Sequence, residues 1–271
     1  MNGKTKYKNP PIVERILGIY ADIDPIAFEE KLPEWQMIVR DSYPISRPIS
    51  EWTIDIKEVN GIPVLQETVP KAEIIYLLWK RHPQKKQVNG MRLRPSRLVF
   101  HLCRDDDKVH DFEEVYDEME AWSGKWMQHF EVKALKGITL EYINRLNAKT
   151  TPQFMLPDGR LQIARAFLMF ANIPGRYKSL TSPYECKMRL AIDEKKPCFF
   201  DVRVTAQEGP YTDVRIDFVV NTTAVGKAIN LDEALAEIRW GHDIMLEEFG
   251  CFFTDEAKAS FNPYGSDRPE G

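Results

Sequence analysis

Residues 230–249 read NLDEALAEIRWGHDIMLEEF, and this stretch decides the fold. One stripe of side chains recurs at alternating steps of four and three, the period of an amphipathic helix. Asn230 can cap the helix, and the acidic residues just after it suit the positive end of the helix dipole. Such a helix must bury its stripe, which consists of Leu231, Leu235, Ile238, His242, Met245 and Phe249.

Three segments with a period of two precede this helix, and each has one apolar and one polar face. Turn residues at 195–197 and 208–210 separate the segments. The pattern predicts an antiparallel meander with one buried face and one solvated face. The inward residues are Cys186, Met188, Leu190, Ile192, Cys198, Phe200, Val202, Val204, Val214, Ile216, Phe218 and Val220.

The first half of the chain has the same order of elements. Its first helix, placed after Pro33, would bury Trp35, Ile38 and Val39. Its long helix begins at Asp111, with an acidic residue three positions later to complete a capping box. The expected elements are strands at 12–20, 52–56, 73–79 and 97–103, a helix at 33–42, and the long helix.

The predicted fold class is α+β, built from two pseudo-repeats of strand, helix, three strands and helix. Residues 1–136 form the N-terminal repeat, and residues 137–271 form the C-terminal repeat with a disordered tail after about residue 262. Each half has an antiparallel sheet backed by a long helix, and the halves are either separate or one continuous domain. By element order alone this resembles the TATA-binding-protein and helix-grip folds, a resemblance that carries no function with it.

Composition narrows the class of protein. The 271 residues are 43% hydrophobic with a net charge of −4, which gives no reason to expect nucleic acid or membrane as an overall partner. No leader and no bilayer-spanning run is recognisable, so a cytoplasmic protein without a membrane partner is expected. The four cysteines are scattered, and nucleophile, phosphate-loop and dinucleotide motifs are absent. We therefore predict no metal, no cofactor and no catalytic residue, and favour a non-enzymatic protein.

A candidate polar cluster joins His242, Asn144 and Glu14. His242 lies on the apolar stripe of the last helix, and Asn144 lies on the inward face of a strand over residues 138–146. Buried polar side chains need partners. The favoured interpretation is that these residues satisfy neighbouring core groups, and the alternative is a ligand-binding or titrating cluster.

The polar faces of the predicted strands carry charges of both signs. A solvated face with cross-strand ion pairs is the favoured interpretation, since each such pair contributes only about 0.2–1 kcal/mol. The alternative is a concave, arginine-lined surface for a phosphate or carboxylate ligand. The residues concerned are Glu141, Arg145, Arg189, Asp201, Arg203, Arg215 and Asp217.

A basic stretch lies between Glu73 and Asp105, where the sequence contains no acidic residue. His82-Pro83 and Asn89-Gly90 give it a loop-like character. It is interpreted as a mobile hairpin tip, with phosphate-backbone contact to nucleic acid as the alternative. The candidate contacts are Lys80, Arg81, Lys85, Lys86, Arg92, Arg94 and Arg97.

Four segments together resemble one family, a sporadically distributed set of uncharacterised prokaryotic proteins. They read YKNPPIVE from Tyr7, LPEWQMIVRDSYP from Leu32, ITLEYINRL from Ile138 and LDEALAEIRWGHDIMLEEF from Leu231. The resemblance implies no assigned activity, and the patchy occurrence of the family fits defence or toxin–antitoxin neighbourhoods. Family members carry equivalents of Pro11, Glu14, Tyr142, Asn144, Arg145 and His242.

The leading functional prediction is a non-catalytic binding or regulatory protein that acts through a protein partner. One alternative is a nucleic-acid-associated accessory factor that uses the basic stretch. Another is a small-ligand receptor or enzyme with a pocket near His242 and Asn144. The oligomeric state is left open.

Overall fold

The computed structural model describes residues 6–53, 56–59, 62–65, 71–79, 90–103, 111–170, 184–193, 196–206, 213–222 and 227–263. Up to residue 136 the elements are β1 (Ile12–Tyr20), α1 (Pro25–Val39), β2 (Ile45–Thr53), β3 (Ile56–Val59), β4 (Ile62–Leu65), β5 (Lys71–Trp79), β6 (Gly90–Arg94), β7 (Arg97–Cys103) and α2 (Phe112–His129). From residue 137 onward they are β8 (Gly137–Asn147), η1 (Pro152–Phe154), α3 (Ile163–Ala166), η2 (Leu168–Phe170), β9 (Tyr184–Asp193), β10 (Lys196–Ala206), β11 (Asp213–Asn221), α4 (Leu231–Phe252) and α5 (Asp255–Ser260).

Nine strands form one antiparallel sheet in the order β2-β5-β6-β7-β1-β8-β11-β10-β9, and β3 pairs with β4 in a separate hairpin. The predicted α+β class with antiparallel pairing is confirmed, as are the strands at 12–20 and 97–103. β1 and β8 pair along their length, with Leu17 opposite Leu140 and Ile19 opposite Ile138. The sheet is therefore continuous across residues 136 and 137.

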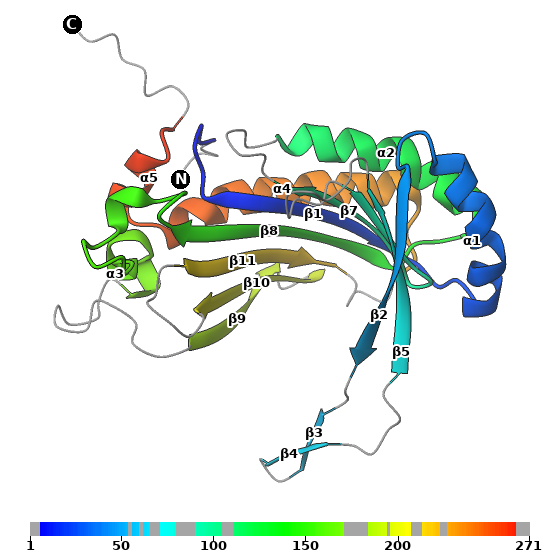
Figure 1. Ribbon diagram of the computed structural model, residues 1–271, viewed down its shortest axis with the longest axis horizontal. Helices are drawn as coiled ribbons and strands as arrows, with labels where there is room; N and C mark the ends of the chain where they lie inside the picture. The colour runs from blue at the N-terminus through cyan, green and yellow to red at the C-terminus, as the bar shows by residue number, and fades with distance from the viewer. Residues whose placement is uncertain are drawn as a thin grey trace, which may run out of the picture.

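The long helices α2 and α4 lie side by side along one face of this sheet (Figure 1). Their inward residues meet the central strands in a closed core, where Ile19, Leu140, Met119 and Ile238 are all fully buried. Burial of each such aliphatic side chain stabilises the fold by roughly 1.5–3 kcal/mol. The two long helices therefore pack against only one face of the middle of the sheet.

Helix α4 confirms the prediction for residues 230–249. The Asn230 side chain accepts a hydrogen bond from the Glu233 amide at 2.8 Å, and the Glu233 carboxylate accepts one from the Asn230 amide at 2.9 Å. This reciprocal capping box satisfies donors that the first turn leaves open. Among the described residues, neither α4 nor another helix has a segment long and apolar enough to cross a bilayer.

The first helix differs from its prediction. α1 begins at Pro25, because the Asp24 carboxylate accepts hydrogen bonds from the amides of Ile26 and Ala27, and Pro33 lies inside the helix. Trp35 and Val39 are buried as expected. The prediction for Ile38 was wrong, since this side chain is 46% exposed. Pro33 has no N–H group, so its place inside α1 costs the helix one backbone hydrogen bond.

Two further predictions need correction. Residues 90–94 were interpreted as part of a loop-like stretch, but they form β6 between β5 and β7. The predicted capping box of the long helix is absent: Asp111 is the N-cap residue of α2, and its side chain makes no capping hydrogen bond. The disordered tail predicted after about residue 262 lies, beyond Pro263, outside the described residues.

Candidate functional site

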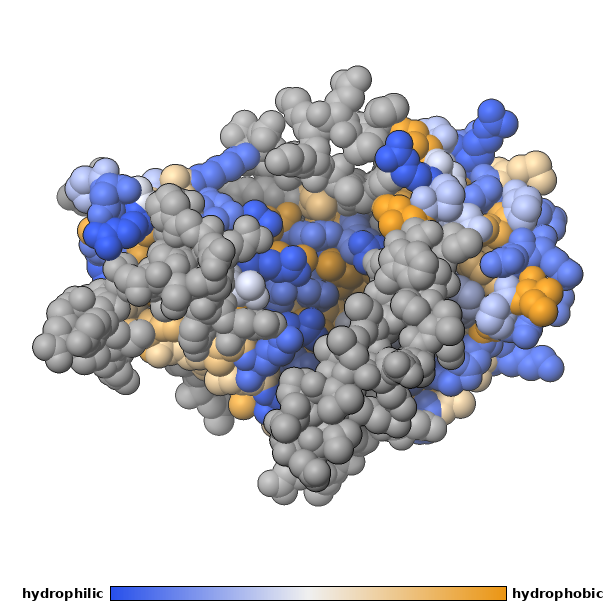
Figure 2. All heavy atoms as spheres, turned by 60° about the horizontal axis from the view of Figure 1, so that its bottom comes forward, coloured by the Kyte–Doolittle hydropathy of each residue, from blue (hydrophilic) through white to orange (hydrophobic). Residues whose placement is uncertain are grey.

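The face of the sheet opposite α2 and α4 is hollowed, and hydrophilic residues gather on its floor (Figure 2). We call this the open face and assign residues to it from the cross-strand register. Among the described residues, basic side chains outnumber acidic ones on it. From β6 to β9 its acidic, basic and histidine residues are Glu14, Arg92, Arg94, Arg97, His101, Glu141, Arg145, Lys187, Arg189, Asp201, Arg203, Asp213, Arg215 and Asp217.

Glu14 on β1 and His101 on β7 form a pair on the open face, in which His101 is buried and Glu14 is partly exposed. The His101 Nδ1–H donates to the Glu14 Oε1 at 2.6 Å. Burial lowers the pKa of His101 more than the neighbouring carboxylate raises it. Burial opposes ionisation of Glu14, but the hydrogen bond and the charge of its neighbours leave its pKa below the usual range. A neutral imidazole and an ionised carboxylate therefore face each other at pH 7.

A second carboxylate, Glu141 on β8, lies near the first. Burial and the charge of Asp217 raise its pKa, while Arg215 acts in the opposite direction. Arg215 lies 3.6 Å from the Glu141 carboxylate and donates to both oxygens of Asp217 at 2.7 and 2.9 Å. One guanidinium thus serves two acidic side chains on adjacent strands. Groups with perturbed pKa values that gather in this way are candidates for a functional site.

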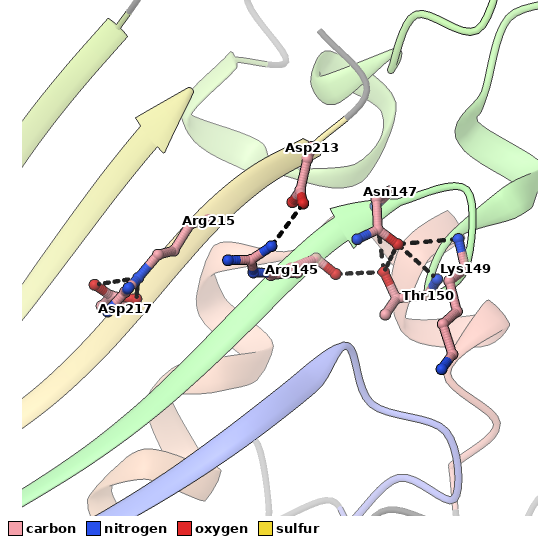
Figure 3. Close-up of polar contacts among 7 residues, drawn as sticks. All are labelled: Arg145, Asn147, Lys149, Thr150, Asp213, Arg215 and Asp217. Carbon is pink, nitrogen blue, oxygen red and sulfur yellow. Dashed lines mark hydrogen bonds and ion pairs between the residues drawn. The ribbon is translucent and has the colours of Figure 1, made fainter. Parts of the chain in front are cut away.

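The ion pairs continue toward both ends of the outer strands. Arg189 on β9 makes a bidentate pair with the buried Asp201 on β10, with both N–O distances 2.8 Å. Arg145 on β8 donates to Asp213 on β11 at 2.8 Å (Figure 3). The forked contact fixes the Arg189 guanidinium in one orientation, whereas the Arg145 contact is a single hydrogen bond. Arg189 is therefore preorganised on the surface.

The end of β8 is fixed by a local turn (Figure 3). The Asn147 Oδ1 accepts hydrogen bonds from the amides of Lys149 and Thr150 at 2.9 and 3.1 Å, and the Thr150 hydroxyl donates to the Arg145 carbonyl. Asn side chains commonly replace a backbone acceptor in this way. The turn holds the Arg145 backbone at the margin of the open face.

A separate cavity of about 300 Å³ lies on the other side of the sheet, between the N-terminal segment, the start of α2 and the second half of α4. Its polar lining includes Arg15 on β1, Tyr142 on β8 and His242 on α4. Apolar side chains complete most of the wall, among them Ile12 and Phe249. A cavity of this size, mainly apolar with a few convergent polar groups, has the properties of a small-molecule site.

The polar groups of this cavity are connected. The guanidinium of Arg15 lies 5.2 Å from the centre of the Tyr142 ring, and the hydroxyl of that ring is 2.5 Å from the His242 Nδ1. Burial raises the pKa of Tyr142, although the charge of Arg15 and its hydrogen bond to the phenol act against this. Because the phenol keeps its proton, it can donate that proton to the imidazole.

The His242 ring is held in one orientation and kept neutral. Phe112 stacks on it with the ring centres 3.9 Å apart and the planes 5° from parallel. Burial, with the nearby charge of Arg15, lowers the pKa of His242 to about 4. A neutral ring that accepts a hydrogen bond at Nδ1 carries its own proton on Nε2. His242 is therefore a hydrogen-bond donor at pH 7.

The structure does not bring His242, Asn144 and Glu14 together, and each lies in a different place. His242 lines the cavity, but its partner is Tyr142. Asn144 is fully buried and donates to the carbonyls of Tyr142 and Ile216, so it serves the sheet backbone. Glu14 lies on the open face with His101. The favoured interpretation, that each residue satisfies a neighbouring core group, describes Asn144 well.

The basic candidates Arg92, Arg94 and Arg97 lie on β6 and β7, inside the sheet and on its open face. Arg94 is buried, and Arg97 contacts the ring and hydroxyl of Tyr20. These three residues therefore belong to strands, and Arg94 and Arg97 are the paired residues that flank the turn between β6 and β7. The other four, Lys80, Arg81, Lys85 and Lys86, lie outside the described residues.

Sequence reasoning missed Arg15, Tyr142 and His101 as site residues. One signal was present. Arg15 lies two residues before Leu17, on the same inward side of β1, and burying a charged side chain there costs free energy that a partner or a function must offset. His101 gives no such signal, because its significance depends on the strand that pairs with β7.

Within the described ranges, no group of three His, Cys, Asp or Glu side chains is arranged to hold a metal ion. No protein-family model matches this chain, and neither a curated protein nor a solved structure matches it. The arrangement of its own residues is thus the basis for assigning a function.

Proposed function

We propose that this chain is a non-catalytic binding protein that holds an acidic protein segment on the open face of its sheet. The observation that carries the proposal is the gathering of charged side chains across the adjacent strands β6, β7, β1, β8, β11 and β10 on one hollowed face (Figure 2). Basic residues predominate there among the described residues, whereas the chain as a whole has a net charge of −4. A local positive surface on an acidic protein favours a complementary acidic partner.

A protein segment fits this surface better than a nucleic acid does. Carboxylates are interleaved with the arginines, and Glu141, Asp201 and Asp217 lie at its centre. A phosphate backbone is uniformly negative and would meet these carboxylates with repulsion. A polypeptide can place both acidic and neutral side chains along the surface.

The existing ion pairs lower the free-energy cost of burying the open face under a protein partner. Arg189 and Asp201 already satisfy each other in forked geometry, and the Arg215 Nε–H donates to both oxygens of Asp217. Covering a paired charge costs less free energy than covering an isolated one. A partner therefore needs to neutralise only the excess positive charge.

We infer further that the two halves are structural pseudo-repeats. Read outward from the central β1–β8 pair, the strand order is β1, β7, β6, β5, β2 on one side and β8, β11, β10, β9 on the other, so the first half has one additional outer strand. Each half thus has its first strand at the centre and its last strand beside it, with a long helix behind. This order supports a saddle of the TATA-binding-protein type whose concave side is the binding surface.

Site-specific photo-cross-linking in the native host tests the proposal. A benzoyl-phenylalanine residue replaces Arg203 or Arg145 on the open face, and matched control variants carry it at the exposed positions Gln128 on α2 and Ala236 on α4. The open-face variants should give a discrete, protease-sensitive adduct that the helix variants lack. The family resemblance makes the products of neighbouring genes the first partners to test.

A charge reversal gives the second arm. Arg203→Glu, combined with the probe at Arg145, should lower the adduct yield by about tenfold, because a rim charge contributes strongly to steering. Equal adducts at the helix positions, or none at the open face, would contradict the proposal. An adduct removed by nuclease would replace the protein partner with a nucleic acid.

A further inference from the structure

We propose that the cavity between β1, β8, α4 and the start of α2 binds a small organic monoanion, an apolar carboxylic acid whose carboxylate meets Arg15. This site lies on the helix-covered side of the sheet, so it is distinct from the open face. The inference does not depend on the proposed protein partner.

Arg15 supplies the positive charge. Its side chain is only 8% exposed, yet it lines the cavity between two elements of the core. A buried guanidinium is stabilised by an anion and presents donors in a plane that matches a carboxylate. Its cross-strand neighbour Tyr142 supports the group through its ring face, at 5.2 Å.

Neutral donors lie beside this cation. The Tyr142 hydroxyl contacts the His242 Nδ1 at 2.5 Å, and Phe112 stacks on the imidazole, so the ring cannot rotate freely. Its remaining N–H group is available to a ligand oxygen. A carboxylate in the cavity would therefore meet a fixed cation and a fixed neutral donor.

The other residues of the cavity wall determine which groups the ligand can carry besides its carboxylate. Ile12, Met245, Leu246 and Phe249 make it apolar. The cavity volume of about 300 Å³ is at the lower end of the range for small-molecule pockets, roughly 300–1,000 Å³. A compact hydrocarbon or aromatic group fits this space better than a sugar.

Beyond Arg15, the charged residues of the lining are one lysine, Lys6, and two acids, Asp111 and Glu113. Asp111 and Glu113 are exposed at the start of α2, and Glu113 is already paired with Arg239 at 3.1 Å. The lining outside Arg15 therefore has no excess of positive charge, which favours a monocarboxylate over a phosphate dianion.

Isothermal titration of the full chain with three matched probes tests the inference. Phenylacetate carries a carboxylate, phenylacetamide is a neutral analogue of the same shape, and phenethylamine is a cation of similar size. Phenylacetate should bind, phenylacetamide should bind at least about tenfold more weakly, and phenethylamine should bind least, since a charge-assisted contact is lost in both analogues. Equal affinities, or no binding of phenylacetate, would overturn the proposal.

Variants separate the role of Arg15 from general stability. Arg15→Met should abolish the preference for phenylacetate over phenylacetamide, whereas Arg15→Lys should retain part of it. Leu246→Trp fills the cavity from a half-buried position and should remove binding of both probes. Ile26→Trp, at a 71% exposed position on α1, is the matched control and should bind like the unmodified chain. Binding that survives Leu246→Trp would overturn the assignment, even if the Arg15 variants failed to fold.

Discussion

Glu14 and Arg15 are consecutive residues of β1 whose side chains lie on opposite sides of the sheet. Glu14 accepts a hydrogen bond from His101 on the open face, and Arg15 lies over the Tyr142 ring in the cavity beneath the helices. Two ionised side chains, the buried Arg15 and the partly buried Glu14, thus lie on the two faces of one central strand. Burial of charge costs stability, and its concentration at one point of the sheet is typical of residues that serve recognition.

The pair of Glu14 and His101 should make the fold sensitive to acid. Burial lowers the pKa of His101 below 6.5, so the unfolded chain takes up a proton before the folded chain does. Stability is therefore present at pH 7 and falls as the pH drops below about 6.5. The lowered pKa of Glu14 acts in the same direction and adds a loss of stability that begins below about pH 4.5.

Urea unfolding between pH 7.5 and pH 5 measures this effect. His101→Gln keeps a side chain that can donate to Glu14 but no longer titrates. The variant should lower the dependence of unfolding free energy on pH by as much as about 1.4 kcal/mol per pH unit, the value for one proton. An unchanged slope would show that the pKa of His101 is the same in the folded and unfolded chains, and would contradict the prediction.

His242 should contribute a second, separate part of the acid sensitivity. Burial lowers its pKa to about 4, so its contribution is present above pH 6.5 and is lost as the pH falls toward 4. The total is at most about 3.4 kcal/mol for a shift of this size. His242→Gln should remove it, as measured by the same titration extended to pH 4. The double variant with His101→Gln should be additive, because the two histidines lie on opposite faces.

Gly18 lies where three strands approach closely, and its replacement tests that packing. A Cβ atom there would lie 2.8 Å from the Thr139 Cγ2 and 3.1 Å from the Val99 Cγ2. Both neighbours are β-branched side chains with few alternative rotamers, so Gly18→Ala should destabilise the fold by about 1–3 kcal/mol.

The matched control is Gly124→Ala on the exposed side of α2. The nearest atom to its added Cβ would be the Leu231 Cδ2 at 3.7 Å, an ordinary contact. Alanine in a helix interior should stabilise it by about 0.5–1 kcal/mol. Thermal unfolding of both variants should give midpoint shifts of opposite sign. A loss of stability in both would indicate that general glycine replacement, and not close strand approach, is responsible.

Local sequence signals were sufficient to predict those helices and strands whose formation depends only on the residues within them. The N-cap and the stripe of α4 could be predicted because both depend only on spacing along one helix. β6 was missed because Asn89-Gly90 and the arginines after it suggest a loop, although Met91 and Leu93 alternate inward. Five residues are too few for periodicity to outweigh these turn signals.

The candidate sites depended on long-range pairing, which the sequence does not show. His242 was recognised from its helix stripe, but its contact with Tyr142 requires α4 to pack over β8. Glu14 was grouped with His242, but it lies on the opposite face of the sheet, and the face of a strand residue depends on its register. The role of Arg15 follows only when β1 is known to pair with β8.

The N-caps of the two long helices should differ in their contribution to stability. Asn230→Ala removes the acceptor for the Glu233 amide, a 2.8 Å hydrogen bond, and should lower the unfolding free energy by about 1 kcal/mol. Asp111→Ala removes no capping hydrogen bond and loses only an interaction with the helix dipole, roughly 0.3 kcal/mol. Urea unfolding at constant pH and salt compares the two. A loss for Asp111→Ala as large as that for Asn230→Ala would mean that Asp111 caps α2 in solution.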